Sequence, residues 1–140
     1  MHMFQQTGLA WSVMVFALLA ATAASSGMAE EPIEYNRDVR PILAENCFAC
    51  HGADSASRKA DLRLDRRDAA IEMGAITAGE PDESELIARI TTEDADLVMP
   101  PPESKKKLTD AEKAILTKWI AAGAEYQQHW SFIAPQRQQP

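Results

Sequence analysis

The sequence predicts a mostly α-helical protein. Apolar residues recur at helical spacing in several segments, and one segment opens with a T-x-x-E capping-box pattern at Thr109 and Glu112. The short alternating stretch DLRLD, residues 61–65, is the one part that resembles a strand. The chain has no internal repeat and no low-complexity tract. These observations indicate short helices joined by loops.

Each predicted helix has an inward apolar face and a recognisable boundary. Pro41 and Pro81 favour the start of a turn, and Gly52, Gly74 and Gly123 favour a stop. The predicted inward residues are Val39, Ile42, Leu43 and Cys47 in residues 34–52, Met73 in residues 65–74, Leu86, Ile87 and Ile90 in residues 81–90, and Ile115, Leu116, Trp119 and Ile120 in residues 108–126.

Residues 1–29 have the pattern of a secretory signal peptide. They contain no Lys, Arg, Asp or Glu, residues 9–24 are almost wholly apolar, and small residues precede a predicted cleavage after Ala29. The usual cationic start is missing, so an uncleaved anchor is the alternative. The apolar run is shorter than the ~20 residues of a membrane span, which favours cleavage. Either way, we expect export and a periplasmic or secreted location.

The charge balance argues against nucleic acid as a partner. The net charge is −7, and all 21 acidic and 14 basic residues follow residue 29. Nucleic-acid binding requires a basic face, which argues against it here. The remaining chain has the length of one small domain with few aromatic residues for its core, and a bound apolar cofactor would help to fill it.

The stretch CFACHG, residues 47–52, holds both cysteines and a histidine directly after the second. A disulfide, part of a zinc site, a dithiol redox centre and a covalent haem anchor all use such thiols. A bridge between Cys47 and Cys50 closes a loop too small to add much stability. Zinc needs four ligands, but this stretch supplies only two thiols and one imidazole. A thioredoxin-like centre needs a βαβ context, which is absent.

Haem c attachment requires what this stretch contains. Cys47 and Cys50 have the spacing for two thioether bonds, and His51 follows as the proximal iron ligand. We therefore predict one covalently bound haem c per chain.

Three side chains are candidates for the sixth iron ligand: Met73, Met99 and His129. Met99 is favoured because the prolines that follow it in VMPPPE would hold the backbone extended and direct its thioether. Met73 is interpreted as a core residue and His129 as a surface or linker residue.

Three further features have two interpretations each. Arg63 or Lys59 could pair with a haem propionate, but a solvated face balanced by Asp61 and Asp65 is preferred. The lysines of SKKK, residues 104–107, could dock an acidic partner, although a solvated loop is preferred. Trp119 could pack against the porphyrin edge or lie in the core.

Several segments in order resemble the Planctomycete-type cytochrome c domain. They are PILAENCFACHG, RKADLRLDRRDAA, GEPDESELIARI, VMPPPESKKKLTDAEKAILTKWIAAGAEY and HWSF. The resemblance implies a small helical cytochrome c fold, with the N-terminal helix and the Trp119 helix crossing at the haem edge. It also implies thioethers at Cys47 and Cys50, with His51 and Met99 as the axial ligands.

These inferences give one expected organisation and function. Residues 1–29 are the signal peptide, 30–126 the cytochrome c domain, and 127–140 a tail or a linker to a domain absent from this chain. We expect an electron carrier rather than an enzyme, serving a redox protein partner or a fused oxidoreductase domain, with membrane contact only through an uncleaved signal. The alternative is a haem enzyme or ligand sensor with an open or labile sixth iron position.

Overall fold

The computed structural model describes residues 31–128 and residue 131, so the predicted signal peptide and His129 lie outside the described residues. Within them the structure has helices and turns and no strand, which confirms the mostly α fold class. No helix among these residues is long and apolar enough to cross a membrane. The elements are η1 (Tyr35–Val39), α1 (Arg40–Asn46), α2 (Phe48–His51), α3 (Arg67–Glu72), η2 (Pro81–Glu83), α4 (Glu85–Thr91), η3 (Pro102–Ser104) and α5 (Asp110–Ala121).

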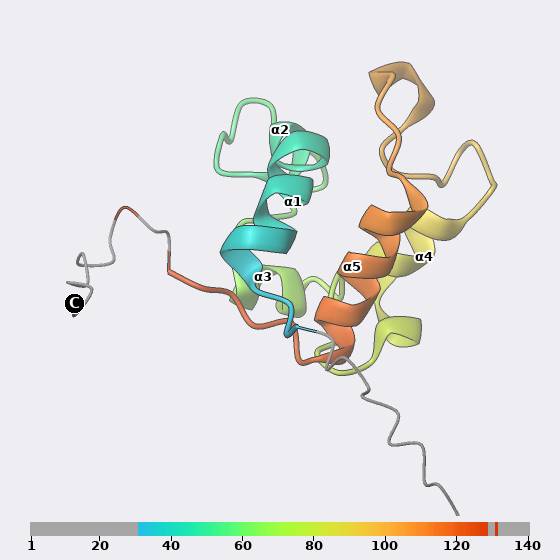
Figure 1. The fold of residues 1–140 in the computed structure, drawn as a ribbon. Coiled ribbons are helices and arrows are strands. Elements are labelled where there is room, and N and C mark those ends of the chain that lie inside the picture. The colour runs from blue at the N-terminus through green and yellow to red at the C-terminus, as the bar shows by residue number, and fades with distance from the viewer. Residues whose placement is uncertain (1–30, 129–130, 132–140) are drawn as a thin grey trace, which may run out of the picture. The chain divides into compact units, whose positions relative to one another are not determined.

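The predicted N-terminal helix is divided into three parts. A π-helical turn, η1, leads into α1, and Cys47 separates α1 from α2 with a φ of −122°. Pro41 lies in the first turn of α1, where a missing backbone N–H leaves no helical hydrogen bond unmade. Cys47 thus lies at the break between the two helices and Cys50 within α2, which follows α1 closely (Figure 1).

Helix α5 begins and ends as the sequence predicts. The Thr109 hydroxyl accepts from the Glu112 backbone N–H at 3.2 Å, and the Glu112 carboxylate accepts from the Thr109 backbone N–H at 2.7 Å. Leu116, Trp119 and Ile120 are buried in the core. Gly123 follows the helix with a φ of +103°, in the region that favours glycine.

An aromatic cluster joins the two ends of the domain. Tyr35 of η1 stacks on Tyr126 with ring centroids 4.4 Å apart, and Trp119 of α5 lies 5.2 Å from Tyr126 and 5.8 Å from Tyr35. The Tyr126 hydroxyl donates to the backbone carbonyl of Leu64 at 2.8 Å. Helix α5 therefore packs against η1, at the start of the N-terminal segment.

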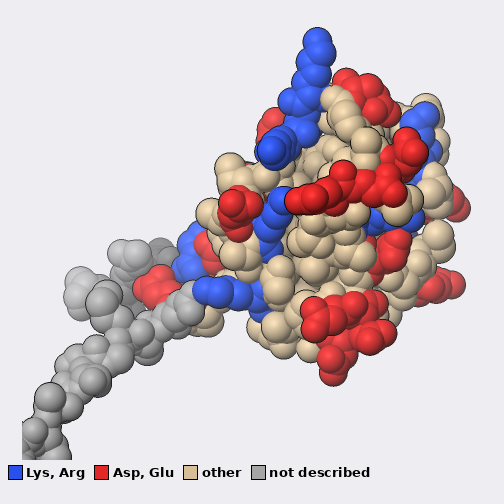
Figure 2. Space-filling view, turned by 90° about the vertical axis from the view of Figure 1, so that its right-hand side faces the viewer, with Lys and Arg blue, Asp and Glu red and all other residues tan. Residues whose placement is uncertain are grey.

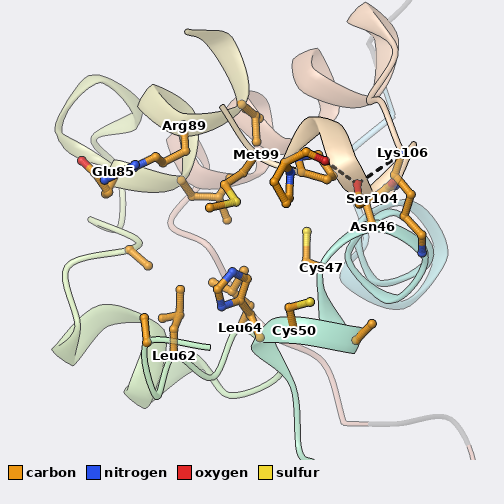
Figure 3. Close-up of a pocket in the computed structure, with 18 of the residues that line it drawn as sticks. Asn46, Cys47, Cys50, Leu62, Leu64, Glu85, Arg89, Met99, Ser104 and Lys106 are labelled. Carbon is orange, nitrogen blue, oxygen red and sulfur yellow. Dashed lines mark hydrogen bonds and ion pairs between the residues drawn. The ribbon is translucent and has the colours of Figure 1, made fainter. Parts of the chain in front are cut away.

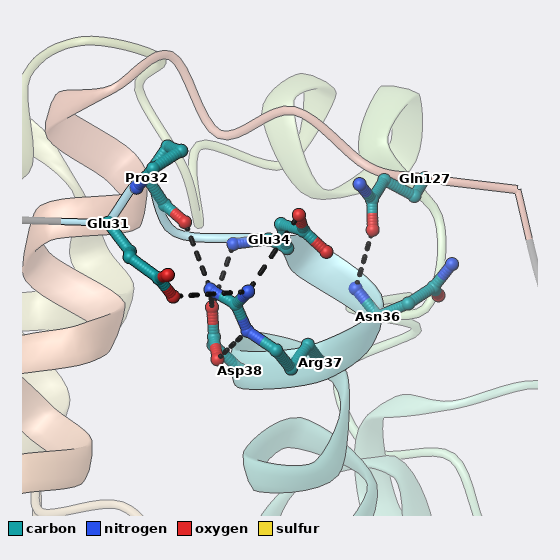
Figure 4. A network of polar contacts seen from close by, with 7 residues as sticks. All are labelled: Glu31, Pro32, Glu34, Asn36, Arg37, Asp38 and Gln127. Carbon is teal, nitrogen blue, oxygen red and sulfur yellow. Dashed lines mark hydrogen bonds and ion pairs between the residues drawn. The ribbon is translucent and has the colours of Figure 1, made fainter.

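Polar contacts fix the N-terminal segment from both sides (Figure 4). The Arg37 guanidinium donates to Asp38 at 2.8 Å and to the Pro32 carbonyl at 3.1 Å. The backbone N–H of Asn36 donates to the side-chain carbonyl of Gln127 at 2.9 Å. The segment after α5 thus runs beside η1.

The middle of the chain departs from the sequence prediction at two points. Pro81 opens a separate 3-10 turn, η2, and α4 begins after Ser84. The buried Ser84 hydroxyl donates to the Glu80 carbonyl at 2.9 Å and accepts from the Thr77 N–H at 2.9 Å, which ties this corner together. Met73 was predicted to face the core, but its side chain is 54% exposed because α3 ends before it.

The helices lie in two groups, with α1, α2 and α3 on one side and α4 and α5 on the other (Figure 1). Figure 2 shows the face with α4 and α5, where acidic side chains are spread over much of the surface and basic side chains project at the top. This distribution agrees with the negative net charge. Buried side chains from both groups form one core.

Candidate functional site

A pocket of about 490 Å³ contains the candidate residues. This volume lies in the ~300–1,000 Å³ range of small-molecule and cofactor sites. Most of its wall is apolar, and its polar groups are few. It is lined by Asn46, Cys47, Ala49, Cys50, His51, Ala60, Leu62, Leu64, Met73, Ala75, Glu85, Leu86, Arg89, Ile90, Met99, Pro100, Pro101, Ser104 and Lys106.

Both thiols line the pocket, Cys47 from the N-cap of α2 and Cys50 from within α2 (Figure 3). One helical turn separates them, since the His51 N–H donates to the Cys47 carbonyl at 2.8 Å. The two sulfurs are not bonded to each other. Burial raises the pKa of the Cys47 thiol to about 11, so this thiol is protonated at neutral pH. Cys50 is exposed to solvent.

Gly52 allows the chain to leave α2 directly after His51. A Cβ atom at this position would lie 2.2 Å from the Phe48 carbonyl oxygen, closer than real Cβ atoms approach backbone. The Leu64 N–H then donates to the His51 carbonyl at 2.9 Å, and the Lys59 N–H donates to the Cys50 carbonyl at 2.7 Å. These hydrogen bonds hold the loop after Gly52 against α2, and Leu62 and Leu64 from this part of the chain line the pocket.

The His51 imidazole has an unsatisfied polar atom. Its Nδ1 is buried and has no hydrogen-bond partner. Burial lowers the pKa of His51, with a smaller opposing effect from the backbone at Lys59. The ring is therefore neutral at physiological pH, and a neutral imidazole has the nitrogen lone pair that a metal ligand needs.

Met99 enters the pocket from the opposite wall, in the segment after α4 (Figure 3). Its backbone N–H donates to the Arg89 carbonyl at 2.9 Å. The prediction that three prolines hold this segment extended was correct only in part. Pro101 is extended, but the Met99–Pro100 peptide is cis and Pro102 begins the 3-10 turn η3.

The structure brings together Cys47, Cys50, His51 and Met99, the four predicted site residues, on one pocket. Met73 also lines it and is largely exposed, so the interpretation of Met73 as a core residue is wrong. His129, the third candidate, lies outside the described residues. Trp119 is 2% exposed and lies in the aromatic core rather than on the pocket.

The cations on the pocket are not those that the sequence suggested. Arg63 pairs with Asp65 at 2.6 Å. This agrees with the preferred interpretation, in which neighbouring aspartates balance its charge. Arg89 and Lys106 line the pocket instead. The spacing of Arg89 could have indicated this. Arg89 lies three residues after Leu86, which was predicted to face inward, and residues three apart lie on the same face of a helix.

The residues around this pocket suit a covalently attached haem. The wall offers two thiols one turn apart, a neutral imidazole with an unpaired buried nitrogen, and a thioether across an apolar space. Imidazole and thioether are iron ligands in c-type cytochromes. Among the described residues no group of three or more His, Cys, Asp or Glu is arranged to hold a metal ion by itself.

Residues 47–103 match the family model described as Planctomycete cytochrome C. This part of the chain is similar to a Planctomycete-type cytochrome c domain. No curated protein and no solved structure matches the chain.

The matched part of the chain begins at Cys47 and ends four residues after Met99. It includes every residue named above as a thioether or iron-ligand candidate within the described part of the chain, whereas η1 and α5 lie outside it. Cytochrome c domains bind haem and transfer electrons.

Proposed function

We propose that this domain binds one haem c and carries single electrons. Cys47 and Cys50 form the two thioether bonds, His51 is the proximal iron ligand, and Met99 is the distal ligand. The observation that carries the proposal is that all four side chains line one largely apolar pocket, with Met99 entering from the wall opposite the thiols.

Haem c supplies the one-electron redox chemistry when it is bound in this pocket. Leu62, Leu64, Leu86 and Ile90 exclude water from its surroundings. His51 stays neutral because of its burial and offers a nitrogen lone pair. A methionine ligand raises the reduction potential relative to a second histidine.

The proposed setting is outside the cytoplasm. The apolar residues 1–29 support export to the periplasm or beyond, and thioether attachment is consistent with that location. The partner is a redox protein or a fused oxidoreductase domain. The acidic surface favours a partner with a basic docking face.

The first test is the pyridine haemochrome spectrum of the full chain, expressed together with a haem c maturation system. We expect a c-type spectrum with one haem per chain, and its loss in a variant with both Cys47→Ser and Cys50→Ser. A full chain that gives no haemochrome would contradict the proposal and leave a structural role for the thiols.

Met99→Ala tests the distal ligand. We expect the ferric wild-type protein to show the sulfur-to-iron charge-transfer band at the red edge of the spectrum and to resist cyanide. Loss of the thioether in Met99→Ala removes the band, opens the sixth position and lowers the midpoint potential.

Met73→Ala is the matched control, because Met73 lines the same pocket and its loss removes the same chemical group. It should keep the band. If Met99→Ala leaves the ferric spectrum unchanged, the distal assignment is wrong. A high-spin wild-type spectrum with rapid cyanide binding would indicate the alternative, a haem enzyme or sensor with an open position.

A further inference from the structure

We propose that Arg89 binds a propionate carboxylate of the haem and holds the Met99 segment in place through the same side chain. The inference rests on the proposed haem attachment at Cys47 and Cys50. It assigns a role to a residue that lines the pocket from α4, on the far side from the thiols.

The position of the two cysteines determines which edge of a bound haem reaches Arg89. In haem c, the thioether carbons and the two propionates lie on opposite halves of the porphyrin. Figure 3 shows Cys47 and Cys50 on one side of the pocket and Glu85 and Arg89 on the side away from them. A ring held at both sulfurs therefore directs its carboxylates toward Arg89.

The Arg89 guanidinium has donors to spare. Its Nε donates to Glu85 Oε1 at 2.7 Å, and its Nη1 lies 3.4 Å from the Leu97 carbonyl oxygen. Within the described residues its Nη2 donates no hydrogen bond. An arginine offers five N–H donors in a planar fork that matches a carboxylate. A propionate would thus share Arg89 with Glu85.

Arg89 also contacts the segment that carries Met99. The Arg89 carbonyl accepts from the Met99 N–H at 2.9 Å, and the Nη1 group reaches the Leu97 carbonyl of the same segment. A carboxylate bound to the guanidinium would restrain it and, through it, residues 97–99. Arg89 is in this respect a positioning residue for Met99.

Lys106 provides the matched control because it is the other cation that lines the pocket. It lies on the side where the cysteines would hold the haem. Its Nζ donates to the Glu45 carbonyl and lies 3.7 Å from Glu45 Oε1, beside the end of α1. Figure 3 shows Lys106 on the same side as Asn46 and Cys47. It is therefore placed to change the local charge without meeting the propionates.

The test compares the holoproteins Arg89→Gln, Arg89→Lys and Lys106→Gln by resonance Raman spectroscopy of the propionate bending mode. We expect this band to shift to lower frequency in Arg89→Gln, to shift less in Arg89→Lys, and to stay unchanged in Lys106→Gln. The midpoint potential falls in both glutamine variants, since each loses a positive charge near the iron. Ferric Arg89→Gln also binds imidazole more tightly than Lys106→Gln, because the Met99 segment is less restrained.

The outcomes separate this inference from the proposed function. An unchanged propionate band in both Arg89 variants, or an equal shift in Lys106→Gln, overturns the role of Arg89. Should Arg89→Gln fail to fold, Arg89→Lys gives the same comparison with the charge retained. Wild-type protein without a haemochrome refutes the proposed haem attachment instead.

Discussion

Gly52 is the residue at which the local geometry of the haem motif is most constrained. Its φ of −127° and ψ of −156° are extended, so backbone strain is not the reason for glycine here. The reason is space, because a Cβ would meet the Phe48 carbonyl oxygen at 2.2 Å. His51 and the loop that follows it depend on this close approach.

Gly52→Ala should therefore destabilise the protein. Overpacking of this kind costs roughly 1–3 kcal/mol, and the backbone of α2 or of residues 52–54 must shift to relieve it. Chemical denaturation of the holoprotein, followed by circular dichroism, gives the change in the free energy of unfolding.

Gly79→Ala is a suitable control for that substitution. Gly79 has a φ of +86°, and no atom lies within 4 Å of the place that an added Cβ would take, so its replacement costs only the backbone strain of about 1 kcal/mol. A smaller loss of stability in Gly52→Ala than in Gly79→Ala would contradict the steric argument.

At the scale of single elements, α5 is the helix whose ends follow most directly from local sequence. Thr109 and Glu112 satisfy each other's backbone donors, and Gly123 follows with a positive φ. Both devices act within a few residues, so neither depends on the rest of the fold. The helix in turn places Trp119 and Ile120 in the core.

Thr109→Ala should lower the free energy of unfolding by about 1 kcal/mol, because the Glu112 N–H loses its side-chain acceptor. Thermal unfolding of the holoprotein measures the loss. Thr109→Ser keeps the hydroxyl and should retain most of the stability. An equal loss in both variants would mean that the threonine methyl group, and not the cap, is responsible.

Helix α4 illustrates an element whose start is not given by its helix-start signal alone. Pro81 is a valid helix-start signal, yet the chain forms a separate turn there and α4 begins at Glu85. The Ser84 hydroxyl contacts Thr77 and Glu80, and these contacts hold the chain in an extended conformation at Ser84. These hydrogen bonds of the Ser84 side chain to the preceding turn place the start of α4 after Ser84.

At the scale of the whole molecule, the aromatic cluster makes the free energy of unfolding depend on pH in the alkaline range. Burial raises the pKa of Tyr35 to about 12, and burial raises the pKa of Tyr126 as well. The folded protein therefore binds these phenolic protons more tightly than the unfolded chain does. The resulting stability is complete below about pH 10 and is lost as the pH rises toward 12.

Tyr35→Phe tests whether ionisation of Tyr35 lowers stability at alkaline pH. The ring stays in the cluster and the titrating hydroxyl is removed, so the free energy of unfolding should fall less steeply between pH 10 and 12 than in the wild type. Denaturation curves across that range measure the slope. Tyr126→Phe serves as a comparison that also loses the hydrogen bond to Leu64 and so is destabilised at neutral pH too. A Tyr35→Phe slope equal to the wild type would contradict the assignment.

Local sequence accounts for the helical class, the bounds of α5, and the motif in which two thiols and an imidazole follow one another. Each depends on neighbours within a few residues, where helical periodicity, capping and covalent spacing act. The prolines after Met99 are also a local signal and favour Met99 as the distal ligand, which stays a prediction, whereas helical periodicity wrongly placed the exposed Met73 in the core.

The tertiary fold selects which distant side chains share the pocket. Met99 faces the thiols because the Met99 N–H binds the Arg89 carbonyl at the end of α4, and α4 is held by core packing of Leu86, Ile87 and Ile90. The Arg63 guanidinium is paired with Asp65, and Arg89 lies on the pocket in its place. The pocket joins the segment of residues 46–51 to that of residues 85–106, which are far apart in the chain, and burial in a shared core, rather than any local pattern, brings such segments together.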